Sequence, residues 1–283
     1  MLFSPALYEI GFTALATLPY LKHSLDLFLA RNRDLVRPDQ EFQGTLTILL
    51  PVWNEEAVLL QKLENLSETS LAFKPNLIIV DSASTDDSVS IIEQWKGKDA
   101  FASYELLRMD ERKGKTAAVK QALEHINSTL NTDLVLMTDA DAMFEANTVS
   151  NLLTWFSDPS IGCVGASPKR LGQRKEEAEH RALFSMVRNL ESKIDSTPFL
   201  EGSCMMWRSE ALDIEVLNVQ SNADDAQIAT NVRINGLRTI QDSETYFIDH
   251  APLQRKEHVR QKVRRAQGLQ RHLLRQRKHL SLI

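Results

Sequence analysis

The chain has 283 residues, of which 43% are hydrophobic and 25% are charged. This length and composition are ordinary for a globular protein with one large domain or two small ones. Its two cysteines, Cys163 and Cys204, give neither a disulfide framework nor a paired zinc-ligand spacing. We therefore expect a protein of a reducing compartment that is built on a hydrophobic core.

The formal net charge of -5 conceals an uneven distribution along the chain. Residues 254–278 contain ten Lys or Arg and one acid, Glu257, which is a local charge of +9 and leaves about -14 elsewhere. Apolar residues recur in this stretch at helical spacing, so it predicts a basic amphipathic helix over 254–283. Such a helix suits either an anionic membrane surface or a cationic lid over a phosphate-binding site.

The N-terminal segment, residues 1–44, raises the question of a membrane. Its apolar run, Ile10 to Leu21, has twelve residues, which is too short for a spanning helix. It also lacks the basic start and the cleavage site of a secretory signal. We expect an amphipathic helix that lies on a membrane or packs on the domain, with spanning by recruitment of neighbouring residues as a third reading.

From Thr45 onward, strand-like apolar runs alternate with helical patterns. Strands are predicted at 45–52, 76–81, 103–109 and 133–139, and helices near 55–68, 86–97 and 114–128. This alternation indicates an α/β fold with a mostly parallel sheet covered by helices on both faces. In such sheets ligands bind at the carboxyl ends of the strands.

Acidic residues fall at those strand ends. Glu55 follows the first strand, Asp81 ends the second, and Asp139 and Asp141 end the fourth in "TDADA". Paired carboxylates of this kind suit a hard divalent cation, Mg²⁺ or Mn²⁺. Taken alone, an Asp-x-Asp pair is more often a solvated acidic turn, so the surrounding motifs decide between the two readings.

Three further stretches bear on chemistry. "RKGKT" places Lys115 beside Gly114 at a helix start, where backbone N–H groups and cations can receive phosphate, although a solvated basic face is an equal alternative. The second half of the chain predicts a helix over 175–194, an extended segment over 199–207 and a helix over 223–234. Asp224 and Asp225 open that last helix, where simple capping is the plainest role for them.

Taken together, these motifs resemble the inverting nucleotide-sugar glycosyltransferases of family 2, which have the GT-A fold, and most closely the cellulose and hyaluronan synthase branch. The resemblance runs from about Leu46 to Gly268 in the family's motif order. It implies that Pro51, Trp53 and Glu55 lie around the nucleoside, that Asp81 reads the base, usually uracil, and that Lys115 lies near the diphosphate.

The same resemblance implies roles for the later motifs. Asp139 is expected near the ribose or sugar, and Asp141 on Mn²⁺ or Mg²⁺, with His250 or His258 as a candidate third ligand. Asp225 resembles the catalytic base, with Asp224 as its neighbour. Glu201, Gly202 and Ser203 are expected on the acceptor side, and Gln261, Arg264 and Arg265 of the C-terminal stretch "QKVRR" on the donor side, with Gln261 and Arg264 in register with a Gln-x-x-Arg motif of the family.

Two departures from the family pattern matter. Arg265 stands where the synthases carry a tryptophan that can hold a sugar, and Glu201 stands where cellulose synthases tend to have a cysteine. No transmembrane helices follow Gly268, so we do not expect processive secretion by this chain alone. The chain is then either a portion of a longer membrane protein or a peripheral transferase that adds single sugars.

The expected domains are a membrane-interface segment and linker over 1–44, a GT-A catalytic domain over 45–253 and a basic helix over 254–283. The expected partners are a nucleotide-sugar, with a UDP-sugar favoured, a glycan, lipid-linked or small-molecule acceptor, and the cytoplasmic face of a membrane. A nucleic acid is not expected, because the basic residues are confined to one helix. Two alternatives stay open: a nucleotidyltransferase on a related fold, and a silent nucleotide-binding scaffold.

Overall fold

The computed structural model describes residues 5–40, 42–172, 175–250 and 255–277. Within these residues one sheet of eight strands forms the body, in the order β3-β2-β1-β4-β7-β6-β8-β5. Its first half consists of the parallel strands β1 (Leu46–Val52), β2 (Asn76–Asp81), β3 (Tyr104–Arg108) and β4 (Leu134–Thr138). These are the four strands predicted from the sequence, and each lies within one residue of its expected limits.

The second half of the sheet differs from the expectation. The strands are β5 (Met143–Phe144), β6 (Ile161–Leu171), β7 (Cys204–Arg208) and β8 (Arg238–His250). β7 runs antiparallel to both β4 and β6, whereas β6 and β8 run parallel to each other and β5 pairs antiparallel with β8. The sheet is therefore mixed, and the prediction of a mostly parallel sheet describes its first half well but its second half poorly.

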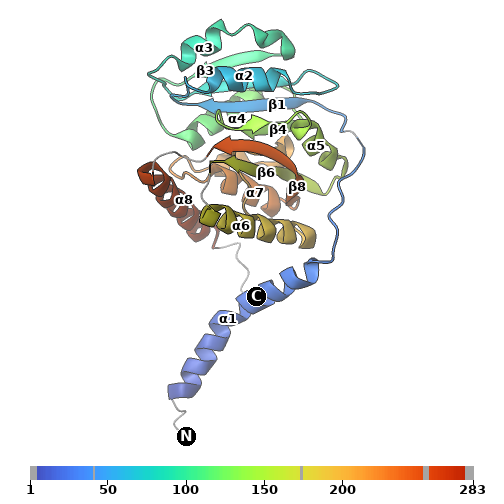
Figure 1. Cartoon of the computed structure of the whole chain (residues 1–283), viewed down its shortest axis with the longest axis vertical. Coiled ribbons are helices and arrows are strands. Elements are labelled where there is room, and N and C mark those ends of the chain that lie inside the picture. The colour runs from blue at the N-terminus through green and yellow to red at the C-terminus, as the bar shows by residue number, and fades with distance from the viewer. Residues whose placement is uncertain (1–4, 41, 173–174, 251–254, 278–283) are drawn as a thin grey trace.

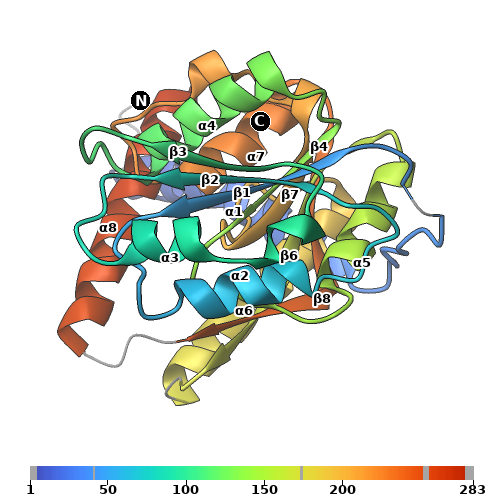
Figure 2. The same ribbon diagram turned by 90° about the horizontal axis from the view of Figure 1, so that it is seen from above.

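Helices cover both faces of the sheet, as predicted (Figure 2). α2 (Leu59–Ser67), α3 (Ser88–Gln94) and α5 (Thr148–Thr154) lie on one face, and α4 (Lys115–Thr129) and α7 (Asp224–Ile234) lie on the other. Alternate side chains of β1 point into the two layers, so that Ile48 and Leu50 join the first core and Leu49 joins the second. All three are fully buried, which fixes the register of β1.

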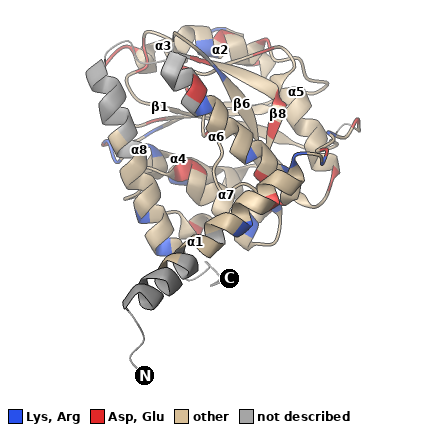
Figure 3. Ribbon diagram, turned by 60° about the horizontal axis from the view of Figure 1, so that its bottom comes forward, with Lys and Arg blue, Asp and Glu red and all other residues tan. Residues whose placement is uncertain are grey.

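The helices at the edge of the body are α6 (Lys175–Ile194), α8 (Arg255–Gln276) and the N-terminal α1 (Pro5–Ala30). α6 packs on β8, α8 contacts α7, and α1 leaves the body after touching α6 (Figures 1 and 3). The helix predicted over 175–194 has those limits. In the part of the chain that the structure describes, no helix is both long enough and apolar enough to cross a bilayer. The amphipathic character of α1 and α8, and the domain limits at 44 and 253, stay predictions.

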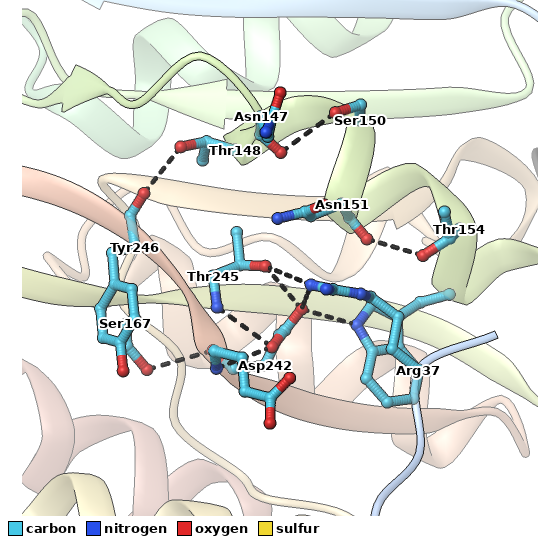
Figure 4. Close-up of polar contacts among 12 residues, drawn as sticks. Arg37, Asn147, Thr148, Ser150, Asn151, Thr154, Ser167, Asp242, Thr245 and Tyr246 are labelled. Atoms are coloured by element: carbon cyan, nitrogen blue, oxygen red, sulfur yellow. Dashed lines mark hydrogen bonds and ion pairs between the residues drawn. The ribbon is translucent and has the colours of Figure 1, made fainter. Parts of the chain in front are cut away.

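The linker between α1 and β1 is fastened to the body by one arginine (Figure 4). Arg37 donates from Nη1 to Oδ2 of Asp242, at 3.2 Å, and to Oγ1 of Thr245, at 2.9 Å. Asp242 is 3% exposed and also accepts from the Trp155 indole and from the backbone N–H groups of Glu244 and Thr245. It thereby stabilises the bulge of β8, where the register against β6 shifts.

Replacing Arg37 by alanine is expected to destabilise the protein, because it removes the cation from a buried carboxylate. Asp242 keeps its other donors, so we expect a loss of about 1–3 kcal/mol, below the usual cost of breaking a buried pair. This corresponds to a fall in Tm of about 2–4 °C for each kcal/mol. Differential scanning calorimetry measures it, with the exposed Arg33→Ala as a matched control. Equal Tm values for the two variants would contradict this role.

Candidate functional site

A cavity of about 630 Å³ opens at the carboxyl ends of β1 and β4, the place predicted for ligand binding. Its volume lies in the range of small-molecule sites. The following predicted site residues line it: Pro51, Trp53, Glu55, Lys115, Asp139, Asp141, Glu201, Gly202, Ser203, Asp224 and Asp225. Among these predicted residues, positions as far apart in sequence as Pro51 and Asp225 therefore converge on one space.

The loop after β1 is held by the loop after β2. Asn54 has a positive φ of 54°, a conformation that asparagine tolerates, and its Oδ1 accepts from the backbone N–H of Thr85 at 2.8 Å. The backbone N–H of Glu55 donates to Oγ of Ser88 at 2.9 Å. These bonds join the loops after β1 and β2, and α2, predicted to start near residue 55, starts at Leu59.

Trp53 stands at the mouth of the cavity and carries a stacked cation. The guanidinium carbon of Arg112 lies 3.1 Å from the centroid of the Trp53 ring, and both residues line the cavity. Trp53 is one of the exposed large hydrophobic residues. A cation over an aromatic face is a favourable contact, so the pair forms a defined rim for the site.

Asp81 lies beside the cavity and does not line it. It is 2% exposed at the end of β2, and its neighbour Ser82 forms part of the lining. Oδ2 of Asp81 accepts from the backbone N–H of Ser84 at 3.1 Å, while Oδ1 is buried with no hydrogen-bond partner. A buried acceptor without a partner is costly, and it suits a ligand that brings a donor.

The first turn of α4 faces the cavity. Gly114, the residue before the helix, has a φ of +93°, which glycine adopts without strain. Gly114 and Lys115 both line the cavity. The neighbouring Lys113 instead pairs with Glu111 at 3.1 Å and is exposed. The helix start and Lys115 together give positive potential at this wall.

Lys115 joins two of the acidic motifs. Its Nζ lies 2.6 Å from Oδ1 of Asp139 and 3.4 Å from Oδ2 of Asp224. Burial lowers the pKa of Lys115, but Asp139 and Asp224 outweigh it, and the net effect raises the pKa above its usual range. Oδ2 of Asp139 accepts from Oγ of Ser203 at 2.8 Å. The acidic turn after β4 is thus tied to α4, to α7 and to the segment before β7.

Negative charge accumulates on the other side of the turn. Burial, then the charges of Asp141 and Asp139, raise the pKa of Glu55 to about 7. Burial, then Asp139 and Asp249, also raise the pKa of Asp141. These shifts mean that the carboxylates repel one another and that a cation among them is favoured.

The residues present fit a divalent cation that is bound together with a ligand. Asp141 lines the cavity, which leaves part of the residue open to solvent, while Asp139 is engaged by Lys115 and Ser203. Among the described residues no cluster of three His, Cys, Asp or Glu side chains forms a complete metal site. Mg²⁺ in proteins typically takes one or two carboxylates and completes its shell with water and substrate phosphates, which matches this set.

The two acids at the start of α7 differ in their surroundings. Asp224 is 5% exposed and lies near Lys115, whereas Asp225 is partly buried and its Oδ1 accepts from the N–H of Ala226 at 2.7 Å. Burial, then the charge of Asp224, raise the pKa of Asp225 to about 7. A Cβ on Gly202 would stand 3.2 Å from that of Asp225, so the glycine permits their close approach.

Some lining residues were not singled out by sequence reasoning. Arg188 of α6 lies in the cavity wall and donates from Nη1 to Oε1 of Glu201 at 2.8 Å. Leu269 of α8 and Asn222 also line the cavity. Nothing in the sequence marks Arg188, because an arginine on a helix is ordinarily a solvated residue. Leu269 is one of the apolar residues at helical spacing in the C-terminal stretch, a pattern that predicts a helix face but no contact with a site.

Several predicted residues cannot be placed. The side chains of His250, His258, Gln261, Arg264 and Arg265 lie outside the described part of the chain, although their backbones belong to β8 and α8. The predictions of a histidine metal ligand and of a cationic Gln-x-x-Arg segment over the diphosphate therefore stay predictions. The packing of Leu269 in the cavity wall and of Gly268 near Ala223 shows that α8 passes the site.

Solved structures share this fold. A mannosyltransferase from Pyrobaculum calidifontis, in complex with GDP-Man and Mn²⁺, is 26% identical with a TM-score of 0.77, over 94% of this chain and 74% of that one. The S. aureus TarS fragment 1–349 with UDP-GlcNAc has a TM-score of 0.58 over 74% of this chain and 59% of that one, at 14% identity. The second likeness concerns the fold alone. The GT-A fold predicted from the sequence is confirmed.

Curated relatives are more distant. An O-antigen chain rhamnosyltransferase of Salmonella typhimurium is 22% identical over 59% of this chain and 54% of its own length. An N-acetylglucosaminyltransferase of Bradyrhizobium diazoefficiens is 25% identical over 58% of this chain and 34% of its own. The chain thus spans about half or less of the length of these relatives. The narrower likeness to cellulose and hyaluronan synthases stays a prediction.

A sequence model of one family, described as "Glycosyl transferase family 2", matches residues 47–214, which is more than half of the chain. That range includes the loop after β1, the start of α4, the acidic turn after β4 and the segment before β7. The chain belongs to glycosyl transferase family 2.

Proposed function

We propose that the cavity transfers a sugar from a nucleotide-sugar to an acceptor hydroxyl with inversion, using Asp225 as general base and a divalent cation held by Asp141 with Asp139. The observation that carries the proposal is the convergence on one cavity of Glu55, Lys115, Asp139, Asp141 and Asp225. Membership of a glycosyltransferase family argues against the nucleotidyltransferase alternative.

The donor would lie across the ends of β1, β2 and β4. The free acceptor oxygen of Asp81 suits the N–H of a uracil or guanine base, and Glu55 lies where it can meet the ribose. The first turn of α4 and Lys115 would receive the diphosphate. A UDP-sugar is our preferred donor from the sequence, and a GDP-sugar is the other candidate, since the neighbour from Pyrobaculum binds GDP-Man.

The chemistry would be one displacement at the anomeric carbon. Asp225 takes the proton from the acceptor hydroxyl, whose oxygen forms the new bond while the bond to the diphosphate breaks. Lys115 places positive charge near the departing diphosphate. When bound, the cation supplies further positive charge to that leaving group. Glu201, Gly202 and Ser203 line the wall next to Asp225, so the acceptor would enter from their side.

The cation requirement is tested by nucleotide binding. Titration calorimetry with UDP and with GDP, each with and without Mn²⁺, is expected to show that Mn²⁺ tightens binding of one nucleotide at least tenfold in the wild type. Asp141→Asn is expected to abolish that difference, because the amide carries no charge. Asp110→Asn, an exposed acid outside the cavity, is the matched control and should bind like the wild type.

The role of Asp225 predicts a pH profile. Because the pKa of the proposed base is about 7, transfer activity should fall as the pH drops below about 7. The assay measures the nucleoside diphosphate released from a donor and acceptor pair. Release of pyrophosphate instead would favour the nucleotidyltransferase, and nucleotide binding with no release would favour the silent scaffold. Asp225→Asn is expected to lower the rate at least 100-fold at pH 8.

Asp225→Asn, which is expected to lower activity, is expected to raise stability. The pKa of Asp225 is raised on folding, so the group costs stability when ionised, above about pH 7, and this cost fades as the pH falls toward the unfolded-state pKa. Asp225→Asn should therefore raise Tm more at pH 8 than at pH 5, by about 2–4 °C for each kcal/mol recovered. The exposed Glu210→Gln should show no such difference.

We also propose that the protein works at the cytoplasmic face of a membrane. α1 presents exposed large apolar side chains, including Leu25 and Phe28, and the C-terminal stretch has a net charge of +9 over 254–278. Insertion of apolar side chains at the interface and attraction of a basic segment to anionic lipid both increase the affinity for a membrane. An acceptor carried on a lipid would be presented at the same surface.

Co-sedimentation with vesicles tests the membrane proposal. Binding is expected to vesicles that contain phosphatidylglycerol, to weaken with added salt, and to fall several-fold in the double variant Leu25→Asp, Phe28→Asp. Leu60→Asp, an exposed leucine on α2, is the matched control and should bind like the wild type. Equal binding by both variants would rule out α1 as the membrane contact.

A further inference from the structure

A lysine is buried where the sequence has an apolar helix face. Lys62 lies on α2 among Leu59, Leu63 and Leu66, all of which face the core, and it is 0% exposed. Burying an ammonium group without partners is very costly. Lys62 does not line the cavity, so it is not placed to touch a ligand.

The partners of Lys62 are at both ends of the acidic turn. Its Nζ donates to Oγ1 of Thr138 at 2.8 Å and also to the carbonyl oxygen of Ala142. The ammonium lies 4.0 Å from the centroid of the Phe144 ring, a third favourable contact. Thr138 immediately precedes Asp139, and Ala142 immediately follows Asp141. The lysine therefore connects the start and the end of the turn that carries both carboxylates.

One turn further along α2, Asn65 continues the same attachment. Its Nδ2 donates to the carbonyl oxygen of Phe144 at 2.9 Å, and its Oδ1 accepts from the backbone N–H of Phe144 at 2.7 Å. Residues three apart on a helix share a face, so Lys62 and Asn65 can both bind residues 138–144. Residues 138–144 are thus held from below by two side chains of α2.

The charges agree with this geometry. Burial lowers the pKa of Lys62 to about 7, while Cys204, Asp139 and Asp141 act in the opposite direction. The ammonium and the two carboxylates therefore stabilise one another across the turn. Asp139 and Asp141 also raise the pKa of Glu55, so the same two carboxylates act electrostatically on Glu55 and on Lys62.

We infer that Lys62 is a positioning residue for the cation site: it holds the turn 138–142 so that Asp139 and Asp141 present their carboxylates to a metal-bound nucleotide. The inference rests on the proposed function for the identity of the ligand. A lysine that merely filled the core would stabilise the fold without any effect on metal-dependent binding beyond its effect on stability.

The test compares Lys62→Met with Leu66→Ala in the full chain. The methionine keeps most of the length of the side chain without the charge, and Leu66→Ala destabilises the same helix without removing a hydrogen bond to the turn. Calorimetric titration with Mn²⁺ and UDP, or GDP if the wild type prefers it, is expected to show at least a tenfold weaker metal-dependent affinity for Lys62→Met. Leu66→Ala should keep the wild-type affinity. An unchanged affinity for Lys62→Met would overturn the inference.

A second variant keeps the test valid if Lys62→Met does not fold. Thr138→Val removes one acceptor of the lysine and keeps the shape of the side chain, and we expect at least threefold weaker metal-dependent binding. Where Lys62→Met does fold, the valine should add nothing in the double variant, because both changes act through one contact. Wild-type affinity in Thr138→Val, or full additivity in the double variant, would count against the inference.

Hydrogen exchange separates this inference from the proposed function. If the wild type binds neither nucleotide with Mn²⁺, the proposed function fails, and the amides of residues 138–144 still report on Lys62. They are expected to exchange at least tenfold faster in Lys62→Met than in Leu66→Ala at equal global stability. Equal exchange in the two variants would show that Lys62 does not hold the turn.

Discussion

The candidate site depends on one ion-pair network, the contact of the Lys115 ammonium with Asp139 and Asp224. Lys115 begins α4, Asp139 immediately follows β4 and Asp224 begins α7, so a single cation joins three elements that the chain brings together from distant positions. An ion pair that is partly buried is stabilising only when its partners are well placed. The hydrogen bond from Ser203 to Asp139 adds a fourth segment to the same network. Loss of any member would leave charge uncompensated at the centre of the cavity, and the geometry of the others would relax.

The cavity contains two pairs of neighbouring acids, Asp139 with Asp141 and Asp224 with Asp225, and the members of each pair have different surroundings. Lys115 lies against Asp139 and Asp224, the inner member of each pair. Asp141 and Asp225, the outer members, instead have raised pKa values because of burial and of their neighbours' charges. In the proposed function Asp141 would meet the cation and Asp225 would accept the proton. Environments that push neighbouring acids apart in this way are a common means of dividing roles in a site.

Much of the first half of the fold could be predicted from the sequence, because continuous apolar runs such as "TILL" and "NLIIV" are typical of buried parallel strands. Glu55, Asp139 and Asp141 could be placed at one edge by the rule that such strands end together. The second half could not be predicted equally well. β6 and β8 mix polar and apolar residues, since Ser167, Gln241 and Asp242 are buried by hydrogen bonds and not by hydrophobic packing. Lys62 did leave a signal, a lone charge at helical spacing between Leu59 and Leu66, whereas Arg188 left none.

Lys62 and Lys115 act on opposite sides of the same turn. Lys115 contacts a carboxylate oxygen of Asp139 from the cavity side, and Lys62 contacts the backbone and hydroxyl groups on the core side. The first lysine is partly exposed and can respond to a ligand, whereas the second is enclosed and cannot move without opening the core. In the proposed site, a turn held in this way would keep its carboxylates in place while no cation is bound, so the entropy of ordering them would be lost on folding and not on binding. This preorganisation is the physical reason that two like charges can stand at a strand end, and it makes the core face of the turn as important to the site as the cavity face.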